Sequence, residues 1–235
     1  MQVYLNEITG IADAFVSLRM SKRSWTEKTD DEIRKICANA LDARGFLINK
    51  SAEYSKLMKS LVKWGRRHIT LFRYIDFSVT VNGMHRAGQD DWDAHAKRFG
   101  NRILRSSTRL ASFGYELSDW YKDKIIPTDL AAKTLNIDLP EELVYNGARY
   151  KKVINGYVRE DLANEQDVLR GLYMLSIPSV FIFKSDLCEW AHVYKERGAH
   201  GGAHPEVKEL AETIANKLEE AQPLFGRALF MEIQN

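Results

Sequence analysis

The sequence predicts an α+β fold, because helix-like and strand-like hydrophobic patterns occupy separate segments of the chain. The clearest strand pattern covers residues 72–81, which are rich in apolar, β-branched and aromatic side chains, and Asn82-Gly83 follows as a turn. The clearest helix covers 206–221, where apolar residues recur at helical intervals with Lys and Glu between them. Two Asn-Gly turns between β-prone residues predict a small hairpin or meander at about 143–158.

The other elements follow from weaker signals along the chain. Weak alternation over residues 2–6 predicts a short edge strand. Gly45 and Gly65 each mark the end of a helical segment. Besides 206–221, the predicted helices are 11–20, 30–43, 52–64, 90–117, 165–175 and 186–197.

Size and composition indicate a globular protein with a single domain over residues 1–235. With 45% hydrophobic and 28% charged residues, the composition is that of an ordinary globular chain. A formal net charge of +2 is too small to favour nucleic acid or a membrane as a partner. The apolar run 177–183 is too short to span a bilayer, and no signal peptide is expected. Two cysteines form no disulfide framework, so a reducing, cytoplasmic setting is expected.

The last quarter of the chain carries the most informative pattern. A predicted helix ends at Arg197, a glycine-rich loop follows, and an amphipathic helix opens with Glu206. This order resembles the C-terminal signature of the flavin-dependent thymidylate synthases, the ThyX family. Arg170 and Arg197 are 27 positions apart, which is the spacing of the two nucleotide-binding arginines in that family. His192 stands where family members place a histidine or asparagine against the flavin.

Three earlier blocks resemble the same family and occur in the expected order. Ser17-Leu-Arg-Met-Ser21 is similar to the early segment in which a serine contacts the flavin. The segment 57–72 contains His68 and Thr70, and it resembles the family's helix, glycine and His-x-[Ser/Thr] element. Asp167-Val-Leu-Arg170 resembles the Glu-x-Ala-Arg element. Together with the C-terminal signature, these blocks span most of the chain.

The resemblance implies a fold, a reaction and an assembly. The fold is a twisted antiparallel or mixed sheet flanked by helices, with the 143–158 hairpin as an insertion. The reaction transfers a one-carbon unit from methylenetetrahydrofolate to C5 of a pyrimidine deoxynucleotide. The substrate would be dUMP or a variant such as dCMP, and the outcome methylation or hydroxymethylation. FAD is the implied cofactor and NADPH the implied reductant. Family members are homotetramers whose active sites form between subunits.

The resemblance also assigns roles to individual residues. A guanidinium can donate paired hydrogen bonds to a uracil carbonyl or a phosphate, and it can stabilise negative charge on the ring. Arg197 is therefore expected to be catalytic, by activating the base. The residues expected to bind substrate are Arg170, Arg109, Ser107, Arg105, Gln89 and Arg86. The residues expected to bind FAD are Ser21, His68, Thr70 and His192.

One hallmark of the family is largely missing. The motif Arg-His-Arg-x-x-Ser-x-Asn-Glu-x-Ser-x-Arg should fall near 95–110, where only Ser107-Thr-Arg109 matches cleanly. Its loss favours an alternative function, a non-catalytic relative that binds nucleotide, nucleic acid or protein as an oligomeric scaffold. The retained arginine pair opposes that alternative. A third possibility is an accidental resemblance in an unassigned α+β protein.

Each candidate also has a plain structural interpretation. Arg170 and Arg197 could be surface or salt-bridge residues, the usual fate of a lone arginine. The arginines at 102–109, a possible phosphate cradle, could equally form a basic helix face. His200 and His204 have a spacing that suits a metal on a helix, but the glycines between them indicate a loop, and no metal is expected. The tryptophans are most simply core or interface anchors, although Trp92 could line a substrate pocket.

Overall fold

A computed structural model describes most of the chain as two compact units. The described residues are 1–20, 28–35, 52–95, 102–106, 117–120, 128–153, 156–164, 175–199 and 203–233. The larger unit consists of Gln2–Val81, Asp91–Leu104 and Ile182–Asn235. The smaller unit consists of Met1, Asn82–Asp90 and Arg105–Phe181. That the chain forms a single domain stays a prediction.

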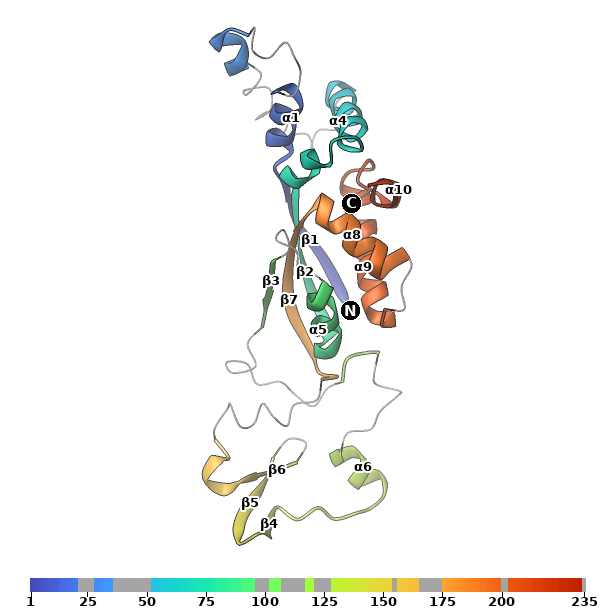
Figure 1. The fold of residues 1–235 in the computed structure, drawn as a ribbon. Coiled ribbons are helices and arrows are strands. Elements are labelled where there is room, and N and C mark those ends of the chain that lie inside the picture. The colour runs from blue at the N-terminus through green and yellow to red at the C-terminus, as the bar shows by residue number, and fades with distance from the viewer. Residues whose placement is uncertain are drawn as a thin grey trace. The chain divides into compact units, whose positions relative to one another are not determined.

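A four-stranded sheet is the framework on which the chain is built. Its strand order is β1-β2-β7-β3, which places β1 and β3 at the two edges (Figure 1). The edge strand expected near residues 2–6 is confirmed. The strands are β1 (Gln2–Thr9), β2 (Asp76–His85), β7 (Pro178–Asp186) and β3 (Arg102–Arg105). With helices against this sheet, the α+β fold class is confirmed.

Strand β2 begins and ends later than the sequence predicted. Residues Ile69–Tyr74 form a 3-10 helix, η3, so Phe72 and Tyr74 do not belong to the strand. Asn82-Gly83 is not a turn, because the strand continues to His85. Gly83 has a φ of +88°, and burial resumes at Met84 after the exposed Asn82. Glycine adopts a positive φ without strain, so an Asn-Gly pair can lie inside a strand as well as in a turn.

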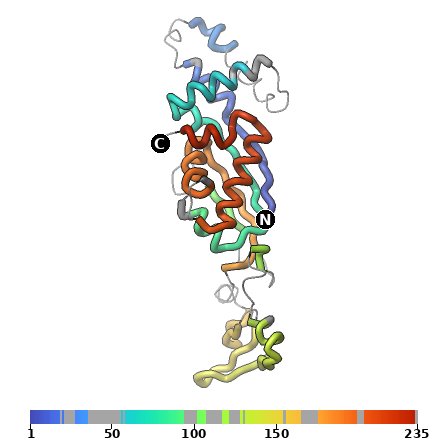
Figure 2. The backbone as a smooth tube through the Cα atoms, turned by 90° about the vertical axis from the view of Figure 1, so that its right-hand side faces the viewer, coloured from blue at the N-terminus to red at the C-terminus, as the bar shows by residue number. Residues whose placement is uncertain are grey.

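Three C-terminal helices cover one face of the sheet in the larger unit. They are α8 (Leu187–Tyr194), α9 (Pro205–Ala221) and α10 (Arg227–Glu232), and Figure 1 shows them on the same side of the strands. Helix α9 packs along β1, as Figure 2 also shows. Its buried positions include Val207, Leu210, Ile214 and Leu218, so the amphipathic helix predicted over 206–221 is confirmed.

The core of the larger unit is an aromatic cluster around Trp190 of α8. Its ring lies 5.5 Å from that of Phe77 in β2 and 6.0 Å from that of Phe230 in α10, both edge-on. Trp92 lies 6.1 Å away, and it also packs edge-on against Phe183 at 5.4 Å. Trp92 is therefore a core residue, which agrees with the simplest interpretation of the tryptophans. Burial of several aromatic rings dominates the stability of such a core.

Two N-terminal helices pack against η3 in the larger unit. Helix α1 (Ile11–Met20) and helix α4 (Ala52–Gly65) confirm the helices predicted at 11–20 and 52–64. A Cβ on Gly65 would lie 2.4 Å from the ring of Phe72, so only glycine fits where α4 meets η3. Of the predicted 30–43 helix, the described part 30–35 is helical.

Gly10, between β1 and α1, gives a test of this packing. Its φ is +78°, and an added Cβ would lie 1.6 Å from the carbonyl oxygen of Tyr74. Gly10→Ala is expected to cost about 2–5 kcal/mol of unfolding free energy, from left-handed backbone strain and overpacking. Gly147→Ala is the matched control, because Gly147 has a φ of +75° but no heavy atom of the described residues within 4 Å of such a Cβ. Denaturant unfolding measures both, and equal losses would contradict the close approach at Gly10.

The long helix predicted over 90–117 is wrong. Helix α5 spans Arg86–His95, and β3 follows at Arg102–Arg105. Ser106 continues the strand pairing, because its N–H donates to the carbonyl oxygen of Val180 at 2.9 Å. Pairing with β7 overrides the helical propensity of the Leu and Arg residues in this segment. Residues 96–101 and 107–116 lie outside the described residues.

The smaller unit contains helix α6 and a separate antiparallel sheet. Helix α6 (Thr128–Thr134) was not predicted. Strands lie where a hairpin or meander was expected: β4 (Glu142–Tyr145), β5 (Ala148–Val153) and β6 (Gly156–Arg159), in that order. Tyr145 pairs with Ala148 across a turn in which Asn146 and Gly147 both have positive φ. Two central residues at positive φ define the type I′ turn that Asn-Gly favours.

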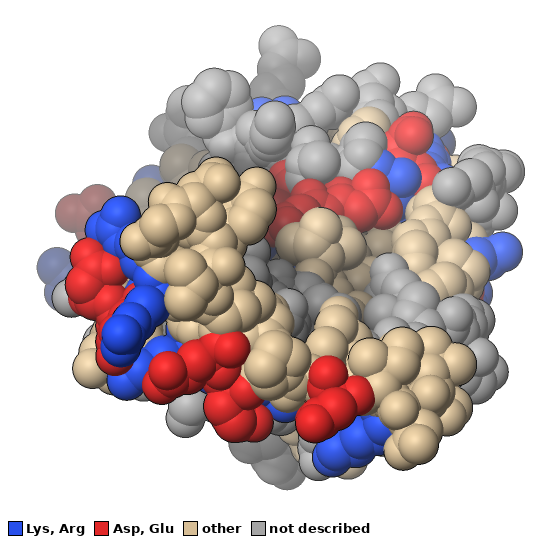
Figure 3. All heavy atoms as spheres, turned by 90° about the horizontal axis from the view of Figure 1, so that it is seen from below, with Lys and Arg blue, Asp and Glu red and all other residues tan. Residues whose placement is uncertain are grey.

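Charges of opposite sign pair between the antiparallel sheet and the short 3-10 helix Glu160–Leu162 that follows it. Lys151 pairs with Glu160 at 3.0 Å, and Arg159 pairs with Asp161 at 2.5 Å. Figure 3, a view from below, likewise shows acidic and basic side chains side by side. This mixture agrees with the small net charge. None of the helices among the described residues is long and apolar enough to cross a bilayer.

Candidate functional site

Arg197 lies on a π-helical turn that directly continues α8. Residues Lys195–Ala199 form this turn, and an added Cβ on Gly198 would lie 2.7 Å from the ring of Tyr194. The Arg197 side chain is only 12% exposed, and its Nη2 lies 3.5 Å from Oδ1 of Asp91 in α5. Its Nε is buried and has no hydrogen-bond partner among the described residues. A buried guanidinium with unused donors is suited to binding a polar ligand.

The start of α8 depends on Asp186, which makes a pH-dependent contribution to stability. The backbone N–H of Glu189 donates to Asp186 Oδ1 at 2.8 Å, so Asp186 is the N-cap. Burial raises the pKa of the Asp186 carboxyl above its ordinary value. The folded state therefore holds this proton more tightly than the unfolded state, and the protein loses stability as the pH rises through the interval between the two pKa values.

We therefore expect Asp186→Asn to keep the cap and remove this cost. The variant should gain stability relative to the parent protein as the pH rises above about 4, where an unfolded aspartate ionises. Asp186→Ala should be less stable than Asp186→Asn by about 0.5–2 kcal/mol at every pH, because both variants lack the ionisable carboxyl and only asparagine keeps the cap. Thermal unfolding across a pH series measures both variants. A pH-independent difference between the parent protein and Asp186→Asn would contradict the role of burial.

Three predicted substrate-binding residues come together in the smaller unit. Gln89 Nε2 donates to the carbonyl oxygen of Met84 at 2.9 Å and to Ser179 Oγ at 2.6 Å. Arg105 Nη2 donates to the carbonyl oxygen of Gln89 at 2.9 Å, and its guanidinium pairs with Asp90. Gln89 and Arg105 form a network of donors that could hold an anionic ligand group, and Arg86 reaches the carbonyl oxygen of Ser106, next to Arg105.

Arg86 and Gln89 are fixed in this group by buried contacts. The backbone N–H of Arg86 donates to the carbonyl oxygen of Ile177 at 3.1 Å. Its Nη1 reaches the carbonyl oxygen of Ser106 at 3.5 Å. Gln89 is buried, and its Oε1 has no hydrogen-bond partner within the described part of the chain. Since the Gln89 amide nitrogen already faces two acceptors, the unpaired oxygen is available to a donor on a ligand or water.

Arg102 and Arg105 do not share a helix face. They occupy a strand, where side chains three positions apart point to opposite faces of the sheet. Arg102 pairs with Asp76 at 2.9 Å in the larger unit. The alternative of a basic helix face therefore fails for Arg102 and Arg105, and the phosphate cradle stays a prediction, because Arg109 lies outside the described residues. The sequence did not predict this strand, because pairing with β7 outweighs the helical propensity of its residues.

Two of the FAD candidates lie at η3. The ring of His68 stacks on that of Trp64 at 5.9 Å, and the Arg67 guanidinium lies 5.8 Å from the centre of the Trp64 ring. Thr70 is exposed in the first turn of η3, and His192 is half-buried in α8, which packs on η3. Exposed aromatic rings beside a guanidinium fit a flat, anionic cofactor such as FAD, so the residues present are compatible with that group.

Several predicted residues lie outside the described part of the chain. They are Ser21, Ser107, Arg109 and Arg170, so their roles and the Arg170–Arg197 spacing stay predictions. His200 also lies outside it. His204 caps α9, because its Nδ1 accepts the backbone N–H of Glu206 at 3.3 Å. Sequence reasoning missed Asp91, because an acidic residue on a polar helix face is normally solvated.

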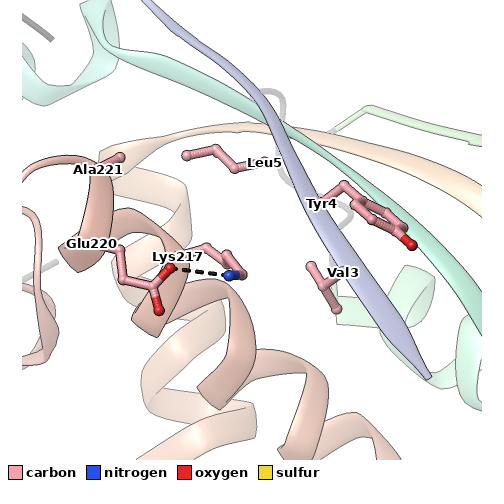
Figure 4. A pocket seen from close by; sticks show the side chains of 6 residues that line it. All are labelled: Val3, Tyr4, Leu5, Lys217, Glu220 and Ala221. Carbon is pink, nitrogen blue, oxygen red and sulfur yellow. Dashed lines mark hydrogen bonds and ion pairs between the residues drawn. The ribbon is translucent and has the colours of Figure 1, made fainter. Parts of the chain in front are cut away.

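A surface hollow of about 440 Å³ lies between β1 and α9 (Figure 4). None of the predicted site residues lines it. Among the described residues its charged side chains are Lys217 and Glu220, which neutralise each other in an ion pair at 3.0 Å. The residues that line it are Val3, Tyr4, Leu5, Lys217, Glu220 and Ala221. The lining of this hollow therefore does not indicate a functional site.

Comparison with known proteins identifies the fold. No protein-family profile matches the sequence, and no curated protein matches it significantly. Thymidylate synthase X from Helicobacter pylori, solved with FAD and dUMP, matches with a TM-score of 0.56. The match covers 98% of this chain and 100% of that chain. The fold is ThyX-like. A UMP/dUMP methylase, PolB from Streptomyces cacaoi bound with 5-Br dUMP, matches with a TM-score of 0.54, covering 95% of this chain and 92% of its own. Both are 12% identical to this chain.

The ThyX-like fold extends over the whole chain, which excludes an accidental resemblance. A second Helicobacter pylori ThyX structure, complexed with FAD and dUMP, matches over all of both chains with a TM-score of 0.55. At this level of identity the likeness establishes the fold alone. The activity has to be argued from the residues.

Proposed function

We propose that this chain is a ThyX-like flavoenzyme that transfers a folate-derived one-carbon unit to C5 of a pyrimidine deoxynucleotide. The substrate would be dUMP or a variant such as dCMP, and the product methylated or hydroxymethylated. The observation that carries the proposal is Arg197, a nearly buried guanidinium with an unpaired Nε at the place where the family resemblance puts a nucleotide-binding arginine. The ThyX-like fold and neighbours that bind dUMP or its 5-bromo analogue support it.

Arg197 would bind and activate the base. Its N–H groups would donate to a ring carbonyl and stabilise negative charge that develops on the ring. Such polarisation needs no cysteine nucleophile, which agrees with a buried Cys188 whose pKa is raised by burial. Arg86, Gln89 and Arg105 are further proposed substrate-binding residues, whose donors suit an anionic group through charge-assisted hydrogen bonds. Arg170, Arg109 and Ser107 complete the proposed set of substrate-binding residues.

FAD would be held by Ser21, His68, Thr70 and His192. The bound flavin would supply the redox chemistry that links NADPH to the one-carbon unit of methylenetetrahydrofolate. The stacked pair His68 and Trp64 would present an aromatic surface to it, with Arg67 adding positive charge. We also propose that the protein is a homotetramer and that it lies in the cytoplasm.

Product analysis tests this function. Purified protein would be incubated with FAD, methylenetetrahydrofolate, NADPH and either dUMP or dCMP, and the nucleotide examined by mass spectrometry. The proposal expects a nucleotide heavier by a methyl or hydroxymethyl group, and none when FAD or the folate is omitted. Binding of FAD and nucleotide without any product would contradict catalysis.

A second candidate is a non-catalytic ThyX-fold protein that binds nucleotide, nucleic acid or a protein partner. The observation that favours it is that both Arg105 and Arg197 are paired with acidic residues of the same chain, Asp90 and Asp91. Such pairing lowers the positive charge offered to a ligand. The product assay separates the two candidates, since only the enzyme changes the mass of the nucleotide.

A further inference from the structure

Asp91 is the acidic neighbour of Arg197, and the two side chains form a long ion pair. Its Oδ1 lies 3.5 Å from Arg197 Nη2, whereas a charge-assisted N–H···O bond is normally about 2.7–2.9 Å. Arg197 is 12% exposed and the Asp91 side chain is 35% exposed. The Nε of Arg197 is buried without a partner among the described residues. The two groups are close enough to attract each other, but Asp91 does not satisfy the guanidinium.

The two side chains offer complementary hydrogen-bonding groups. A guanidinium only donates, and an ionised carboxylate only accepts. Side by side they match a ring edge on which an acceptor stands next to a donor. Uracil has such an edge in a carbonyl oxygen beside N3–H. Cytosine has one in N3 beside its 4-amino group.

We propose that Asp91 is a specificity-determining residue that accepts a hydrogen bond from the base next to the atom bound by Arg197. The proposal rests on the proposed function, in which Arg197 binds the base. The donor would be N3–H of a uracil nucleotide or the amino group of a cytosine nucleotide. A site that hydrogen-bonds a ligand N–H rejects the analogue that lacks it, because a buried polar group is then left unpaired.

An Asp91 carboxylate that binds the base differs from a purely structural one in one measurable way. A carboxylate that only neutralised Arg197 would affect the binding of every nucleotide to a similar extent. A carboxylate that accepts from the ring distinguishes nucleotides with the ring donor from those without it. The ratio of two affinities therefore reports on the hydrogen bond, while the absolute affinity also reports on the placement of Arg197.

The test compares dUMP with its N3-methyl analogue on purified full-length protein supplied with FAD. Isothermal titration calorimetry gives both dissociation constants. The parent protein should bind dUMP roughly 10- to 100-fold more tightly than N3-methyl-dUMP, since a hydrogen bond to a charged group is lost. Asp91→Ala should bring this ratio close to one. Asp91→Asn keeps a neutral acceptor, so its ratio should fall between the two.

Asp93→Ala is the matched control, because Asp93 is an exposed acid two positions further along α5. It should keep the ratio of the parent protein. A parent ratio near one, or a ratio that neither Asp91 variant lowers, would overturn the role of Asp91. If dUMP and dCMP both fail to bind the parent protein, the proposed function itself is overturned, and that outcome is distinct from an unchanged ratio. Asp91→Asn keeps the test valid if Asp91→Ala does not fold.

Discussion

Replacing Arg197 by alanine is expected to weaken dUMP binding roughly 10- to 100-fold, because charge-assisted hydrogen bonds to the base are lost. If the guanidinium also stabilises charge in the transition state, kcat should fall by about 10²- to 10³-fold. The fold should survive, since among the described residues the Arg197 side chain has one long contact, with Asp91 at 3.5 Å. Calorimetry with dUMP and single-turnover product analysis measure the two effects.

Arg66→Ala is a suitable control for the Arg197 variant. Arg66 is also an arginine of the larger unit, but it is half-exposed and pairs with Glu232 at 2.8 Å. Exposed pairs of this kind contribute little to stability, and Arg66 has no proposed role in binding. Its variant should bind dUMP like the parent protein. Equal effects of the two substitutions would contradict a specific role for Arg197.

Trp190→Ala should produce the largest loss of stability, about 3–5 kcal/mol of unfolding free energy. The ring is fully buried and packs against Phe77, Trp92, Phe183 and Phe230. Its removal leaves a cavity at the point where β2, α5, β7 and α10 meet inside the larger unit. Denaturant unfolding followed by circular dichroism measures the loss.

Trp64→Ala provides the comparison for Trp190. Trp64 is 39% exposed and contacts mainly His68 and Arg67, so its loss should cost about 1 kcal/mol or less. The same variant should weaken FAD binding if the stacked pair forms part of the cofactor site. A Trp190 variant as stable as the Trp64 variant would show that the aromatic cluster is not the core of the larger unit.

Local patterns in the sequence were sufficient to predict those elements whose formation depends mainly on their own residues. The amphipathic spacing from Val207 to Leu218 predicted α9 because that helix buries one face. Asn146-Gly147 predicted a hairpin turn because few other residue pairs adopt two positive φ angles. Gly65 predicted the end of α4, where a Cβ would meet the ring of Phe72.

The elements that were predicted wrongly are those whose structure depends on contacts with residues far away in the sequence. Residues Arg102–Arg105 have helical propensity, yet they form β3 next to β7. Phe72 looks like part of a strand, but it is buried in the short helix η3. In both segments, tertiary packing outweighs local preference, and a single sequence gives no direct measure of such packing.

The candidate site could be predicted only in part. The resemblance pointed to Arg197, Gln89 and Arg105, and the structure brings the last two into direct contact. It did not point to Asp90 and Asp91, because acidic residues on a polar helix are usually solvated. Their partners are far away in the sequence, at Arg105 and Arg197. Contacts of this kind depend on the fold, and they cannot be read from local spacing.

The most direct test of the central claim is an absorbance spectrum of the purified protein, recorded before and after adding FAD and then dUMP. A ThyX-like flavoenzyme should take up FAD, and its flavin bands should shift when dUMP binds beside the cofactor. The Arg197→Ala protein should still take up FAD but show a weaker shift at the same dUMP concentration. A parent protein that takes up no FAD under these conditions would contradict the flavoenzyme function.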